Sequence, residues 1–260
     1  MITTTEAWLQ QTRQKCLDVC AAQGNPAFTD FAGHALKALL VDELRRYTPH
    51  SLGACLGDFW RFIEDSRQDV AVRVFNPDLA KVGWRPEGTV IEIYAGELPF
   101  LLNTLRIALH RGDYGMQVLL DLNLPLRRDN FFRVRAVPDA ADATAPEYRT
   151  LIHIELAGLY EGEALATLEA DIRRAITPLQ RVVGGFPRMQ TLCRDAAQQL
   201  IDNLPRGGDE GVGRMEAHAF LQWLLRGHFT FIAARRRYAN GETEHCGLGL
   251  DQDIAGALDW

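Results

Sequence analysis

The sequence predicts an α+β fold in which two helices cover one face of an antiparallel sheet. Three observations lead to this class: segments with the two-residue alternation of strands, segments with the apolar spacing of helices, and the order in which they follow one another. The core order is strand, helix, strand, strand, helix, with one extra strand before it and one candidate strand after it. This order corresponds to the βαββαβ plan.

A helical N-terminal cap is expected over residues 1–66. Apolar residues recur between positions 6 and 23, and the Gly-Asn-Pro sequence at 24–26 is typical of the end of a helix. A second amphipathic helix is expected from 28 toward 47, and a third over 55–66.

Strand alternation begins at Asp69. Residues 70–75 alternate and end at the Asn-Pro turn 76–77. Residues 89–95 form a second expected strand, in which Val90, Glu92 and Tyr94 face away from Ile91, Ile93 and Ala95.

A helix should follow this second strand directly. Leucines at helical spacing run from Leu98 to Leu109, Pro99 suits a first turn, and Gly112 is a stop signal. Residues 116–129 and 149–156 then alternate as two further strands.

A second long helix should run from Gly158 to a stop at Gly184–Gly185. Residues 67–186 are thus predicted to form one ferredoxin-like α+β module. The remainder, 187–260, is predicted to be a helical linker and the start of a second α/β segment, with a candidate strand over 228–238.

Composition excludes several classes of partner. The formal net charge is −6, so no global positive field would gather nucleic acid. No window approaches 18 uninterrupted apolar residues, which argues against a membrane partner. Five cysteines without a CxxC pair, and no secretory leader pattern, favour a reducing cytoplasmic location.

Candidate catalytic groups are few. The two serines, Ser51 and Ser66, lie in no GxSxG sequence, so a serine nucleophile is not expected. The turn from Gly96 to Pro99 is unsuited to phosphate, because Glu97 would repel the anion and proline removes a backbone donor.

Two pairs of side chains remain. His153 and Glu155 project from one side of a strand and could chelate a metal given a third ligand, but the sequence indicates none, so we expect no metal site. Arg235 and Arg237 share one face of the candidate strand, where they could contact a carboxylate. A solvated strand end or an interdomain contact is the simpler interpretation of this arginine run.

Several strings together resemble the N-terminal region of the large bacterial NAD-specific glutamate dehydrogenases. They are FWRF, VRVFNP, GW, TVIEIYAGELPFLLNTLRIAL, HIEL, FLQWLLRGHFTF and GLGL. Their order and spacing cover nearly everything from Asp58 to Leu250. The resemblance implies a regulatory module of the ACT type. It also implies that this chain is a fragment whose dehydrogenase domain lies far downstream.

The resemblance places an effector-binding or module-interface turn at one position in this chain. Its residues are Gly96, Glu97, Leu98, Pro99 and Asn103. Effector-binding ACT modules usually carry glycine where this chain has Phe100, and this departure favours contacts between modules or subunits over effector binding at the turn.

The leading hypothesis is therefore a non-catalytic regulatory and assembly segment of an NAD-dependent glutamate dehydrogenase. No catalytic residue and no cofactor is assigned to the segment, and NAD belongs to the parent enzyme. Expected partners are downstream domains, neighbouring subunits of a homo-oligomer formed through exposed sheet edges, and an amino-acid effector. The alternatives are a stand-alone ACT-type amino-acid sensor and, more weakly, a metal-dependent enzyme using His153 and Glu155.

Overall fold

The computed structural model divides the chain into two compact units. The first is formed by Met1–Leu98 with Leu102–Arg173, and the second by Pro99–Leu101 with Arg174–Trp260. Each unit is described by itself. The structure describes residues 4–138, 147–202, 205 and 208–248.

The first unit begins with helices, as the sequence predicts. Asn25 caps the second helix by accepting a hydrogen bond from the Phe28 amide, and Pro26 occupies the first turn, where an amide would have no partner. The predicted second helix is shorter than expected, because Leu39 and Leu40 are extended and a short helix follows them. The helices are α1 (Thr4–Ala21), α2 (Pro26–Ala38), α3 (Val41–Leu44) and α4 (Pro49–Asp65).

A five-stranded antiparallel sheet follows, which confirms the predicted α+β class. The strand order is β1-β2-β5-β3-β4, and in the register Glu92 lies opposite His153 and Val90 opposite Glu155. The elements are β1 (Val70–Phe75), α5 (Leu79–Val82), β2 (Val90–Ala95), α6 (Leu101–Arg111), β3 (Met116–Arg128), β4 (Val134–Ala136) and β5 (Glu147–Leu156).

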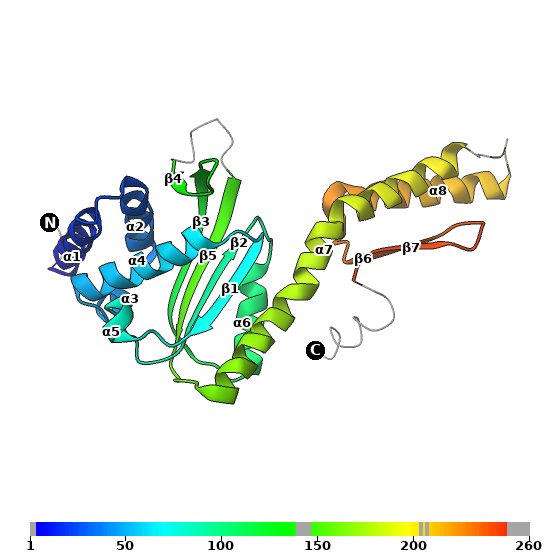
Figure 1. Ribbon diagram of the computed structural model, residues 1–260. Helices are drawn as coiled ribbons and strands as arrows, with labels where there is room; N and C mark the ends of the chain where they lie inside the picture. The colour runs from blue at the N-terminus through cyan, green and yellow to red at the C-terminus, as the bar shows by residue number, and fades with distance from the viewer. Residues whose placement is uncertain (1–3, 139–146, 203–204, 206–207, 249–260) are drawn as a thin grey trace. The chain divides into compact units, whose positions relative to one another are not determined.

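Helices cover the sheet on both faces. One apolar core joins the N-terminal helices to the sheet through residues such as Tyr94, Leu120 and Leu151. Figure 1 shows α4 along that face and α6 on the opposite one. All six residues of β2 are therefore buried, including Glu92, which faces α4.

The sheet departs from the predicted plan at one edge. The position beside β2 is taken by β1, the extra strand before the strand-helix-strand-strand-helix core, rather than by a strand that follows the second helix. The predicted strand over 228–238 therefore does not join the sheet. Residues 233–237 of this segment pair with a later strand in a separate hairpin.

The second unit contains the end of one long helix, a shorter helix and that hairpin. The predicted helix stop at Gly184–Gly185 is wrong, because the helix continues through it. Gly185 instead permits a close approach, since a Cβ there would lie 2.7 Å from the Gly247 amide nitrogen. The elements are α7 (Gly162–Asp202), α8 (Asp209–Trp223), the π-helical turn η1 (Leu224–His228), β6 (Ala233–Arg237) and β7 (Thr243–Gly247).

Among the described residues, no helix has both the length and the apolar character needed to cross a bilayer.

Glu244 of β7 gives the second unit a pH-dependent contact. Arg188 donates to its carboxylate at 2.5 and 2.8 Å and the Tyr238 hydroxyl at 2.6 Å, and these bonds lower the Glu244 pKa from 4.5 to about 2. A depressed folded-state pKa contributes stability above pH 4.5 that is lost as pH falls toward 2. We expect the protection factors of the β6–β7 amides, which are exchange rates corrected for the intrinsic effect of pH, to fall across this window. Glu244→Gln should lower these protection factors already at pH 7.

Glu242→Gln is the matched control for this prediction, because Glu242 lies in the same hairpin and its side chain contacts Asn240. Equal exchange rates in the Glu244 and Glu242 variants would contradict the assignment.

Candidate functional site

A cluster of buried polar side chains lies between α4 and the sheet. Cys55 and Asp58 are one turn apart on α4, so both face the strands. Strand alternation directs His153 and Glu155 of β5 to the same face, and Glu92 of β2 is the cross-strand neighbour of His153. All five side chains are buried.

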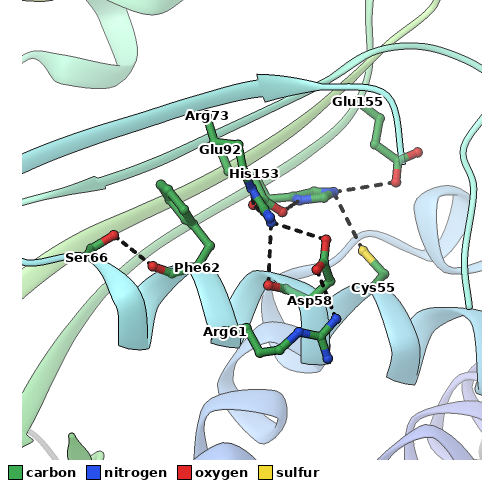
Figure 2. A network of polar contacts seen from close by, with 9 residues as sticks. All are labelled: Cys55, Asp58, Arg61, Phe62, Ser66, Arg73, Glu92, His153 and Glu155. Atoms are coloured by element: carbon green, nitrogen blue, oxygen red, sulfur yellow. Dashed lines mark hydrogen bonds and ion pairs between the residues drawn. The ribbon is translucent and has the colours of Figure 1, made fainter. Parts of the chain in front are cut away.

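Glu92 is the centre of this cluster. Its Oε1 lies 2.9 Å from His153 Nδ1, while its Oε2 accepts from Arg73 Nε at 2.9 Å and also from Arg73 Nη2. Arg73 Nη2 reaches Asp58 Oδ2 at 3.2 Å, so the guanidinium joins the strands to α4. Figure 2 shows these side chains converging from the helix and the sheet.

The other side of the imidazole faces a cysteine and a second carboxylate. His153 Nε2 lies 3.8 Å from Cys55 Sγ and 3.4 Å from Glu155 Oε1 (Figure 2). The Tyr47 hydroxyl donates to the same Glu155 oxygen. Phe59 and Trp84 close the cluster, with ring centroids 5.6 and 5.7 Å from that of His153.

The protonation states follow from these contacts. Burial opposes a charge on His153, but contacts with Cys55, Glu155 and Glu92 outweigh it and raise the His153 pKa well above 6.5. Burial raises the pKa of the Cys55 thiol to about 11 despite the lowering effect of His153. An imidazolium and Arg73 therefore balance the two glutamates, and Cys55 stays a thiol.

Cys55, His153 and Glu92 stand in the order of a nucleophile, a base and an orienting acid. The thiol is buried and its pKa is raised, whereas reactive cysteines are partly exposed thiolates. The arrangement therefore does not favour nucleophilic catalysis. Its donor atoms are instead suited to holding a metal, since one atom each of Cys55, His153 and Glu155 lie within 4.8 Å of one another.

The structure thus brings Cys55 to the pair His153 and Glu155, which the sequence indicated; the sequence did not indicate Cys55. The spacing of His153 and Glu155 was visible, but Cys55 is 98 residues from His153 and only the fold makes them neighbours. The helical spacing of Cys55 and Asp58, which places both on one face of α4, was the one sequence feature that could have indicated the contribution of Cys55.

The predicted effector turn lies between β2 and α6. Gly96 donates its amide to the Asp69 carbonyl at 2.8 Å, and Glu97, Pro99 and Asn103 are exposed. Phe100 is 66% exposed and has a φ of 68°, a conformation that glycine favours. The helix starts at Leu101, later than predicted.

The predicted arginine pair lies in β6, far along the chain from the cluster. Arg235 and Arg237 are both exposed and share one face of the strand, as the alternation predicted. Phe229 and Phe231 precede the strand. Arg236, on the other face, lies 3.7 Å from Asp195.

The five-stranded antiparallel sheet and its helices define a mixed α+β module of the ACT-like, ferredoxin-like class. Residues 31–172, more than half of the chain, match the family model described as "Glutamate dehydrogenase, ACT1 domain". The chain belongs to this family, which confirms the resemblance found in the sequence.

Two curated relatives are named NAD-specific glutamate dehydrogenase. The one from Halomonas elongata is 31% identical over 175 residues, covering 66% of this chain and 11% of the relative. The one from Pseudomonas aeruginosa is 28% identical over 209 residues, covering 80% of this chain and 13% of the relative. The chain thus spans only a small part of these relatives.

Proposed function

We propose that this chain is a non-catalytic regulatory and assembly segment in the N-terminal part of an NAD-dependent glutamate dehydrogenase. The parent enzyme would oxidatively deaminate L-glutamate to 2-oxoglutarate, with NAD held by domains outside this segment. The family match and the small share of each relative that the chain spans support this proposal. The buried cluster supports it as well, because its thiol and imidazole lie where substrate has no access.

The observation that carries the assembly role is a set of exposed apolar side chains on the second unit. Six large apolar side chains there are between 46% and 60% exposed, and two of them, Phe220 and Trp223, stack with ring centroids 6.0 Å apart. Exposed aromatic and apolar side chains fit a protein partner better than an amino-acid ligand. The six are Val212, Met215, Phe220, Trp223, Phe229 and Ile232.

Self-association tests this role. We expect the chain to sediment above monomer mass with rising concentration, and the double variant Met215→Glu and Phe220→Glu to weaken that association by about tenfold or more, or about 1.4 kcal/mol. Phe131→Glu is the control, because Phe131 is 78% exposed in the first unit. A chain that stays monomeric throughout would contradict the homo-oligomer.

A stand-alone amino-acid sensor is the second candidate. The exposed Phe100 favours it, because a ring directed into solvent does not fill the turn formed by Gly96, Glu97, Leu98, Pro99 and Asn103. For this candidate we infer that Glu97 would hold the ammonium group of the amino acid and that an arginine would hold its carboxylate. Titration calorimetry with glutamate, aspartate and arginine separates the candidates. Saturable binding favours the sensor, and the absence of binding heat favours the assembly role.

A further inference from the structure

We propose that Cys55, His153 and Glu155 bind one structural Zn²⁺ ion that fastens helix α4 to strand β5. The ligand atoms would be the Cys55 sulfur, the His153 Nε2 and a carboxylate oxygen of Glu155. This site is independent of the proposed function, because it requires neither an effector nor a partner domain.

The two donor separations measured from His153 Nε2 fit a tetrahedral ion better than direct hydrogen bonds. Two ligands held about 2.0–2.3 Å from zinc at tetrahedral angles lie about 3.3–3.7 Å apart. The observed separations from His153 Nε2 are 3.4 Å to Glu155 Oε1 and 3.8 Å to Cys55 Sγ. The first is longer than an ordinary hydrogen bond, and one N–H cannot point at both acceptors.

The surroundings of the imidazole have the form expected around a metal ligand. Histidine ligands donate their second ring nitrogen to a carboxylate or carbonyl, which fixes the tautomer and the ring orientation. Glu92 Oε1 lies 2.9 Å from His153 Nδ1, and Arg73 holds the other Glu92 oxygen. A proton on Nδ1 leaves the Nε2 lone pair directed toward the cysteine and Glu155.

Charge balance also suits an ion at this place. Zn²⁺ binding would release the Cys55 thiol proton and the His153 Nε2 proton. The resulting thiolate, the Glu155 carboxylate and a neutral imidazole would offset the two charges of Zn²⁺, while Arg73 offsets Glu92. Burial without net charge avoids the large cost of an unpaired ion. A sulfur, a nitrogen and an oxygen donor favour zinc over calcium or magnesium, which prefer oxygen alone.

The burial of the three ligands indicates a structural rather than a catalytic ion, and the fourth tetrahedral position would be filled from inside the protein. The three ligands are 2–3% exposed, so no open coordination position faces substrate. The Tyr47 hydroxyl on Glu155 supplies a further oxygen beside the cluster. The ion would join the N-terminal helices to the sheet at the point where Asp58 and Arg73 already do so.

Metal content of the chain expressed in zinc-supplemented medium tests the site. We expect about one zinc per chain by elemental mass spectrometry, and about a tenfold or greater loss in Cys55→Ala and in Glu155→Gln. Cys20→Ala is the matched control, because Cys20 is an equally buried cysteine of the same helical region outside the cluster. Expression with Co²⁺ adds a spectroscopic readout, since a thiolate-to-cobalt charge-transfer band should appear in the control and vanish in Cys55→Ala.

Circular dichroism establishes that each variant is folded. Glu155→Gln preserves side-chain volume, so it still tests the site should Cys55→Ala unfold. A folded wild-type chain without zinc would overturn the proposal. Equal zinc in Cys55→Ala, Glu155→Gln and the Cys20 control would also overturn it, because the metal would then sit elsewhere.

Discussion

Replacing Glu92 with alanine should lower the free energy of unfolding by about 3–5 kcal/mol. Glu92 is fully buried and bonds both His153 and Arg73, so its removal leaves the His153 Nδ1 proton without an acceptor inside the protein. Arg73 loses its main counter-charge, although it is 29% exposed and can turn toward water. Urea unfolding followed by circular dichroism, with chelator present so that bound metal does not contribute, measures the change.

Two variants bracket this result. Glu92→Gln keeps the shape and one acceptor, so a smaller loss is expected, whereas Glu87→Ala removes an exposed ion pair with Arg46 and should change stability by about 0.5 kcal/mol or less. If Glu92→Ala lowered the free energy of unfolding by less than about 1 kcal/mol, the charges of His153 and Arg73 would have other partners.

Much of this arrangement could be predicted from local sequence. The alternation in TVIEIYA placed Glu92 on one face of its strand, and that in RTLIHIEL placed His153 and Glu155 together. Both faces are buried, however, and alternation alone does not reveal that a polar face will be covered. That outcome depends on the N-terminal helices packing against the sheet.

The remaining features depend on contacts between distant segments. No local pattern brings Cys55 to β5, and none places β1 at the sheet edge expected for a later strand. The helix stop predicted at Gly184–Gly185 is wrong for the same reason. Glycine favours helix ends in general, but here Gly185 leaves room for the β7 backbone.

Phe59→Ala should have an effect of similar size, a loss of about 3–5 kcal/mol. Phe59 is fully buried, and its ring packs edge-on against Phe31, with centroids 5.8 Å apart. It also packs at a tilt against the His153 ring, with centroids 5.6 Å apart. Removing it opens a cavity where the apolar core of the N-terminal helices meets the polar cluster. Phe131→Ala, at a 78% exposed position, should stay within about 0.5 kcal/mol.

Combining Phe59→Ala with Glu92→Gln distinguishes a shared structural unit from two separate contributions. Both residues contact His153, Phe59 by packing against the imidazole ring and Glu92 through Nδ1. Neighbouring sites with a common partner couple by about 0.5–3 kcal/mol, whereas independent sites add within about 0.5 kcal/mol. We expect the double variant to lose less free energy of unfolding than the sum of the two single losses. Once one change has removed a contact that holds the imidazole, the other change disrupts fewer remaining interactions. Simple additivity would mean that the core and the cluster stabilise the fold separately.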